Sequence, residues 1–260
     1  MKDTAAAKRD SEWMPLTEHL GELRKRIIYC LIVFVIGLVG GLFGSQPLFD
    51  YLVAAAPIDN LDLHAFSPWD AIGLYMKFAI LISFVAAIPF TMYQLWAFVR
   101  PALGPKEQRA TLQFVPGALG MFLIGLAFSY FVVFPMAFLF TEKVTSNLGL
   151  EQTYGVTQYF SFLFNILLPI SLLFELPLLI LFLTRIGILN PAMLRKMRKL
   201  AWFILIFVGV LVTPPDVVSD LLVAVPLILL YEFSVLLSSM AYGKRLKTQR
   251  QRELELESDE

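Results

Sequence analysis

Six apolar runs with few or no charged residues constrain the fold of this chain more than any other feature. They lie at about 27–43, 72–99, 111–140, 157–184, 200–213 and 221–242. A helix needs roughly 20 apolar residues to cross the hydrocarbon core of a bilayer. We therefore expect an all-α integral membrane protein with six transmembrane helices, and an even number of crossings places both termini on the same side.

The composition supports a membrane as the solvent. The 260 residues are 58% hydrophobic and 16% charged, whereas a soluble domain is usually about 45–50% apolar and about 25% charged. A soluble fold of this length has no core large enough to hide so much apolar surface, so we expect membrane lipids around the bundle. The first run is followed by Gly-Ser-Gln-Pro and not by a small-residue cleavage site, which predicts a span that is retained.

Lysine and arginine alternate between the two sides of this topology. Six lie before the first run, three in 100–110, five in 185–199 and five in the tail, whereas 44–71 and 214–220 have none and 141–156 has one. Positively charged loops stay in the cytoplasm, so we expect both termini there. We divide the chain into a disordered N-terminus (1–14), a membrane domain (15–243) and a charged cytoplasmic tail (244–260).

The fifth and sixth runs are short for membrane spans. Between Leu200 and Val212 about 13 residues are apolar, and they cover roughly 20 Å of a hydrocarbon core about 30 Å thick. Either the bilayer thins there or these helices do not reach the far surface. A tilted pair completed by Thr213 and Pro214 is the third interpretation. We find no internal repeat, which counts against the common transporter plans.

Two acids lie on the predicted cytoplasmic side. In the stretch EHLGELRKR an apolar stripe predicts a helix on the membrane surface, and Glu22 and Arg26, four residues apart, are expected to pair along it. In PALGPKEQR, Pro105 suits the start of a helix and Glu107 its first turn, where the helix dipole favours an acid. Each acid therefore has a simple local explanation.

An apolar shelf of Phe98, Pro101 and Leu103 lies beside the second acid. Two carboxylates at one level of the membrane suit a ligand with two guanidinium groups, because arginine pairs with carboxylates through two parallel hydrogen bonds and lysine does not. An apolar segment that follows the two arginines is expected to lie along the shelf.

Glu175 is an acid inside the fourth run. An ionised carboxylate there costs roughly 2.5–3.5 kcal/mol on insertion scales. The residue is therefore either functional or an internally hydrogen-bonded acid, and a proton-coupled small-solute carrier that uses Glu175 is the alternative function. For Lys77 and Glu232, near the ends of spans, we expect side chains that extend towards the interface.

The sequence contains no recognisable motif for catalysis or for cofactor binding. A single cysteine, Cys30, excludes an intrachain disulfide, and two histidines far apart argue against a metal centre. The chain lacks HExxH, G-x-S-x-G and a pair of mid-span aspartates. We therefore expect no enzyme activity, no metal and no cofactor.

Five strings in order from about residue 15 to 243 resemble the TatC family, the multispanning core component of the twin-arginine protein translocase. They are PLTEHLGELRKR, YQLWAFVRPALGPKEQR, YFVVFPMAF, FELP and TPPDVVSD. The resemblance implies a glove-like concave bundle in the cytoplasmic (inner) membrane. It implies a receptor that binds Arg-Arg signal peptides of folded precursors for export driven by the proton gradient. It also implies single-span partners of the TatA/TatB type, a homo-oligomer within the complex, and no nucleic acid.

By the same resemblance, Glu22 and Glu107 receive the two arginines. The residues that shape this site are Leu20, Arg24, Phe98, Pro101, Leu103 and Arg109. Glu175 lies in the concave face, where it meets polar groups of partner helices or transported segments. The surface that docks the single-span partners comprises Val210, Thr213, Pro214, Pro215, Asp216 and Asp220. Pro57 has a structural role in the first external loop, and Gln108 and Asp220 depart from residues common in the family.

Overall fold

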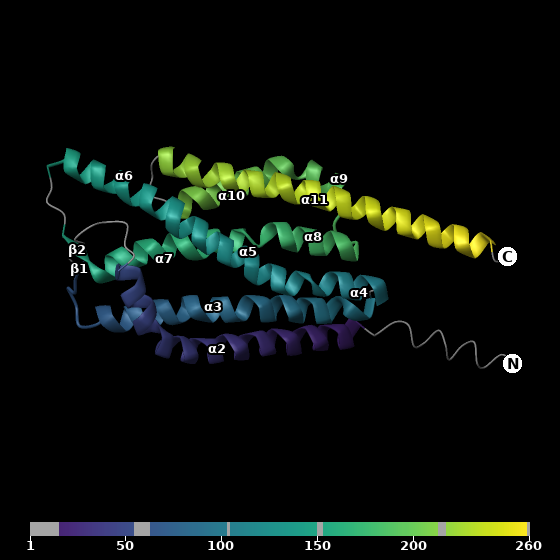
Figure 1. Ribbon diagram of the computed structural model, residues 1–260, viewed down its shortest axis with the longest axis horizontal. Coiled ribbons are helices and arrows are strands. Elements are labelled where there is room, and N and C mark those ends of the chain that lie inside the picture. The colour runs from purple at the N-terminus through teal and green to yellow at the C-terminus, as the bar shows by residue number, and fades with distance from the viewer. Residues whose placement is uncertain (1–15, 55–62, 103–104, 150–152, 213–216, 259–260) are drawn as a thin grey trace.

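The computed structural model describes residues 16–54, 63–102, 105–149, 153–212 and 217–258, nearly all of them helical. Two long helices, α2 (Leu16–Ala54) and α3 (Asp70–Val99), pack side by side (Figure 1). The expected surface helix is wrong: its residues form the beginning of α2. Neither a proline nor a polar capping residue separates them from the apolar run, and the single Gly21 does not end the helix.

The third apolar run is helical except for a turn at Gln113, and its winding changes along its length. A short turn, η1 (Arg100–Ala102), and α4 (Pro105–Leu112) lead into α5 (Phe114–Phe128), the π-helical turn η2 (Ser129–Val133) and α6 (Phe134–Asn147). Pro135 has no N–H for the carbonyl four residues earlier, so the helix widens just before it. Outside the helices, β1 (Leu63–His64) pairs in parallel with β2 (Tyr154–Gly155) and joins two loops.

The fourth run is bent in its middle. It forms α7 (Val156–Leu173) and α8 (Leu176–Ile186), which are separated at Phe174 and Glu175. Pro177 cannot donate to the carbonyl of Leu173, which breaks the helical ladder at this point. The ladder resumes where the Leu179 N–H donates to the Glu175 carbonyl at 3.0 Å. Glu175 therefore lies at the bend between the two helices.

The last part of the chain begins with α9 (Pro191–Lys196), whose first turn is capped where the Asn190 side chain accepts from the Met193 N–H at 2.7 Å. One short helix and one very long helix follow. Helix α10 (Arg198–Val212) has 15 residues and is about 22 Å long, less than the hydrocarbon thickness. Helix α11 (Val217–Ser258) continues through most of the segment that we assigned to a separate tail. Thr213 and Pro214, on which the tilted-pair interpretation depends, lie outside the described residues.

Five stretches of the described chain are long and apolar enough to cross a bilayer. They are Gly21–Ala54, Asp70–Val99, Phe114–Asn147, Val156–Ile186 and Val223–Gly243. The beginning of α2 and the end of α11 lie at the same end of the bundle (Figure 1). Helices α10 and α11 lie on one side of α7 and α8, and α2 and α3 lie on the other.

The core forms around α7, which packs against α3 on one side and against η2 and the beginning of α6 on the other. Phe78, Phe134 and Phe160 are fully buried, and the ring centroids of Phe78 and Phe160 are 5.2 Å apart. Close packing of α5 on α7 depends on Gly125, because a Cβ there would lie 2.7 Å from the Ser171 Cα atom. This contact holds α5 against the turn that precedes Glu175.

Candidate functional site

A groove with a volume of about 510 Å³ lies between α2, α3 and the α7–α8 bend. We call it the α2–α3 groove. Its lining is apolar along most of the facing stretches of α2 and α3. The polar groups that line it are Arg26, Gln94, Thr91 and Glu175. The groove therefore suits an apolar segment that carries polar groups at a few fixed positions.

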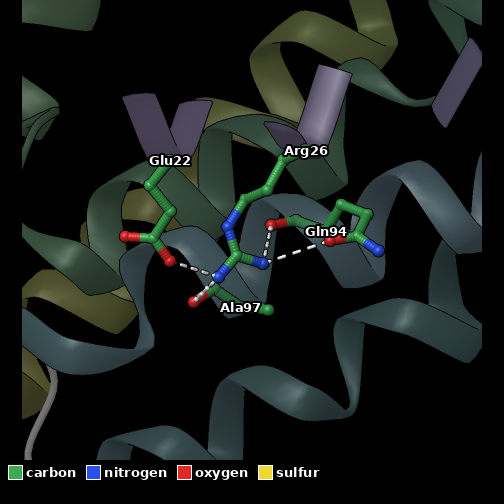
Figure 2. A network of polar contacts seen from close by, with 4 residues as sticks. All are labelled: Glu22, Arg26, Gln94 and Ala97. Carbon is green, nitrogen blue, oxygen red and sulfur yellow. Dashed lines mark hydrogen bonds and ion pairs between the residues drawn. The ribbon is translucent and has the colours of Figure 1, made fainter. Parts of the chain in front are cut away.

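Glu22 and Arg26 pair at the edge of this groove, as the sequence predicted (Figure 2). The Arg26 Nη2 atom lies 2.6 Å from Glu22 Oε1 and donates to the Ala97 carbonyl at 3.1 Å. Its Nη1 atom donates to Gln94 Oε1 at 3.1 Å and, more weakly, to the Gln94 carbonyl at 3.4 Å. The second carboxylate oxygen of Glu22 points away from this network (Figure 2). One guanidinium thus joins the beginning of α2 to the end of α3.

Pro101 explains why a backbone carbonyl is available to Arg26. In a continuing helix the Ala97 carbonyl would accept from the N–H of the residue four positions later. That residue is Pro101, which has no N–H. A carbonyl in the last turn of a helix also carries part of the negative end of the helix dipole. The proline therefore leaves an acceptor that suits a cation.

Glu175 is the other acid of the groove, and it is only 7% exposed. Within the described residues, neither of its carboxylate oxygens has a hydrogen-bond partner, and its side chain does not cap α8. Burial of an unpartnered carboxyl is unfavourable. The interpretation of Glu175 as an internally hydrogen-bonded acid is therefore wrong, because no donor in the described part of the chain reaches its carboxylate.

The other predicted signal-peptide residues divide into those that the structure describes and those that it does not. Phe98 lines the groove, whereas Arg24, Pro101 and Arg109 are exposed and are not among its lining residues. Helix α4 begins at Pro105, so the backbone of Glu107 lies in its first turn as expected. Leu103 and the side chains of Leu20 and Glu107 lie outside the described part.

The predicted partner-docking residues are described only in part. Val210 is 41% exposed near the end of α10, and Asp220 lies in the first turn of α11. Thr213, Pro214, Pro215 and Asp216 lie outside the described residues, and so does Pro57.

Lys77 and Glu232, for which the sequence predicts side chains that extend towards the interface, have partners on neighbouring helices. The Lys77 ammonium donates to the hydroxyl of Ser161 on α7. Glu232 Oε1 lies 2.8 Å from Arg198 Nε and accepts from Trp202 Nε1 at 3.1 Å, which links α11 to α10. Partners on neighbouring helices hold both side chains because the packed bundle brings donors and acceptors within their reach.

Gln94 and Ala97 are functional candidates that the sequence did not suggest. They lie 68 and 71 residues from Arg26, so only the packing of α2 on α3 reveals the contact. An amide inside an apolar run was the available signal for Gln94, and Pro101 was the signal for the Ala97 carbonyl. Among the described residues, no group of three acidic, His or Cys side chains is placed to hold a metal ion.

Comparison with known proteins gives a consistent set of relatives. A family model described as Sec-independent protein translocase protein (TatC) matches residues 18–226. TatC of Halalkalibacterium halodurans is 42% identical over 95% of this chain and 98% of its own length. TatC of Escherichia coli K12 is 34% identical over 88% of this chain and 90% of its own. A crystal structure described as the twin arginine translocase receptor TatC matches with a TM-score of 0.70 and 31% identity, over 86% of this chain and 99% of that one.

Proposed function

The chain belongs to the TatC family of Sec-independent protein translocase proteins, and from this premise we propose that it is the translocase receptor for Arg-Arg signal peptides. It is a helical membrane protein and a transport component, not an enzyme, as the sequence predicted. Because the family consists of protein translocase components, the small-solute carrier is not retained as an alternative.

The Glu22 carboxylate supports this proposal most strongly. It binds a guanidinium group at 2.6 Å beside the α2–α3 groove, and its side chain is still 29% exposed. A peptide with two arginines followed by an apolar segment matches this arrangement. We assign one arginine to Glu22, the other to Glu107, and the apolar segment to the groove beyond Phe98.

We assign the remaining site residues to the borders of this path. Three of them are exposed, namely Arg24, Pro101 and Arg109. Leu20 and Leu103 complete the set. Glu175, buried and unpartnered in the groove, is proposed to meet a polar group of a transported segment or a partner helix.

We further propose six spans with both termini in the cytoplasm. The alternation of cations along the sequence supports this orientation, and so does the position of both helix ends at one end of the bundle (Figure 1). Helix α10 is then the fifth crossing, and its 15 residues require the bilayer to thin around it.

The single-span partners of the TatA/TatB type are proposed to dock where α10 ends and α11 begins. Val210 is exposed there, and Thr213, Pro214, Pro215, Asp216 and Asp220 complete the surface. Several copies of the chain are proposed to assemble in the cytoplasmic membrane, with the proton gradient driving export.

Photocrosslinking tests the receptor proposal. A photoreactive residue replaces Phe98 in the groove and, as a control, Phe203, which is 67% exposed on α10. An Arg-Arg precursor should crosslink at position 98 and not at 203, and crosslinking should be lost with a Lys-Lys precursor or with Glu107→Ala. Equal crosslinking of both precursors at position 98 would contradict the proposal.

A further inference from the structure

A guanidinium group already occupies the acid that we assign to the ligand. Arg26 is four residues from Glu22 and takes its Oε1 atom at 2.6 Å. The same guanidinium also reaches the Ala97 carbonyl and the Gln94 side-chain oxygen, both at 3.1 Å (Figure 2). An intrahelical pair requires only the first contact, so the two contacts to α3 need a separate explanation.

The acceptors around Arg26 match a guanidinium better than an ammonium. One is a carboxylate on α2, and the others are oxygens of the last turns of α3. A planar guanidinium directs N–H groups towards both helices at once, whereas a lysine ammonium is a compact point charge. Pro101 keeps the Ala97 carbonyl free of a helical N–H. These groups together form a guanidinium site.

This site adjoins the path proposed for the signal peptide. Arg26 and Gln94 line the α2–α3 groove together with Leu23 and Phe98. An arginine at the head of an apolar segment that enters the groove reaches the same oxygens. Arg26 also fills the site imperfectly, because its Nε atom is buried without a hydrogen-bond partner in the described part of the chain.

We propose that Arg26 is a built-in occupant of the subsite for one ligand arginine, and that the ligand displaces it. The subsite comprises the Glu22 carboxylate, the Gln94 side-chain oxygen and the Ala97 carbonyl. This inference rests on the proposed receptor function and adds to it a source of specificity. An incoming arginine restores the hydrogen bonds that Arg26 gives up, whereas an incoming lysine does not.

An opposite role for Arg26 makes the opposite prediction. If Arg26 stays in place and holds Glu22 so that the second carboxylate oxygen receives the ligand, removal of Arg26 weakens binding. If Arg26 competes with the ligand, its removal strengthens binding. The sign of the effect therefore distinguishes a competitor from a positioning residue.

Peptide titrations on the full chain in nanodiscs measure this sign. The variants are R26Q and, as a control with the same loss of charge, K25Q at the exposed Lys25. R26Q should bind an Arg-Arg signal peptide about tenfold more tightly, because a charged hydrogen-bonded contact no longer has to be broken. Its preference for Arg-Arg over Lys-Lys should shrink, and K25Q should stay within about twofold of the wild type. Weaker binding by R26Q would overturn the inference.

A small guanidinium tests the subsite without any peptide. In R26A, ethylguanidinium at low millimolar concentration should raise the Tm, whereas ethylammonium should not. Neither compound should raise the Tm of the wild type or of the double variant E22Q/R26A. If R26A does not fold, R26S serves in its place. Absence of stabilisation by ethylguanidinium in a folded variant would overturn the subsite.

The two experiments separate failure of the inference from failure of the proposed function. If the wild type and K25Q prefer Arg-Arg but R26Q binds more weakly, the receptor stands and the competitor role of Arg26 falls. If no protein prefers Arg-Arg, the receptor falls and the displacement falls with it, even where ethylguanidinium still stabilises R26A.

Discussion

Glu175 and Glu232 are both acids inside apolar runs of the sequence, yet their surroundings differ completely. Glu232 on α11 has an arginine and a tryptophan of α10 as partners and is about a third exposed. Glu175 at the α7–α8 bend is only 7% exposed, and neither oxygen has a partner among the described residues. Glu232 therefore holds two helices together, whereas Glu175 adds nothing visible to the stability of the fold. An acid that is unfavourable for folding is the better candidate for binding a ligand.

The largest expected effect comes from the packing that isolates Glu175. Gly125→Ala places a Cβ 2.7 Å from the Ser171 Cα atom, so α5 must move away from α7. We expect the free energy of unfolding to fall by about 1–3 kcal/mol, measured by thermal unfolding. Gly120→Ala is the matched control, since no atom beyond the backbone of its own helix lies within 4 Å of its added Cβ. Equal effects of the two substitutions would show that the α5–α7 contact is not close.

Replacement of the unpartnered acid should stabilise the protein. Glu175→Leu removes a buried carboxyl that makes no hydrogen bond within the described residues, so the free energy of unfolding should rise by about 1–2 kcal/mol. Export of twin-arginine precursors should fall at the same time. A variant that unfolds more easily than the wild type would indicate a structural role for Glu175.

The partnered acid should respond in the opposite direction. Glu232→Leu leaves Arg198 and the Trp202 N–H without their acceptor, and the free energy of unfolding should fall by about 1 kcal/mol. The effect is modest because Arg198 is 40% exposed and solvent screens the pair. Unchanged thermal unfolding would mean that this ion pair does not help to hold α10 on α11.

A single hydrogen bond gives the smallest effect. Trp202→Phe keeps an aromatic side chain, although a smaller one, and removes the N–H donor to Glu232. We expect a loss of about 0.5 kcal/mol in thermal unfolding and no change in Arg-Arg peptide binding. A change in peptide binding would show that the contact between α10 and α11 influences the α2–α3 groove, which we expect it not to do.

The sequence predicted those features that depend on neighbours along the chain. The apolar runs became the helices, Glu22 paired with Arg26 one turn away, and Pro105 began α4. It did not predict contacts between helices. Arg26 binds Gln94 and Ala97, which are 68 and 71 residues away, and Lys77 binds Ser161, which is 84 residues away. Only the packing of α2, α3 and α7 brings these residues together. Helical periodicity gives the face of a residue but not the neighbour on that face.

The same limit explains one local prediction that was wrong and one that was incomplete. An apolar stripe at residues 16–27 predicted a surface helix, but the helix continues without a break into the span. The prediction for Lys77 and Glu232 considered only lipid and water around these side chains, so it did not include Ser161 and Arg198 as their partners. In both cases the outcome depended on the surrounding structure and not on the local residue pattern.

Binding of signal peptides to Glu22→Gln and Glu232→Gln tests the central claim most directly. Each substitution removes one negative charge and keeps the side-chain shape, but only Glu22 belongs to the proposed receptor site. Titration of the full chain in nanodiscs with Arg-Arg and Lys-Lys peptides should show that Glu232→Gln keeps the wild-type preference for Arg-Arg and that Glu22→Gln loses it. If both variants keep the preference, or if the wild type has none, Glu22 is not the acid that receives the signal peptide.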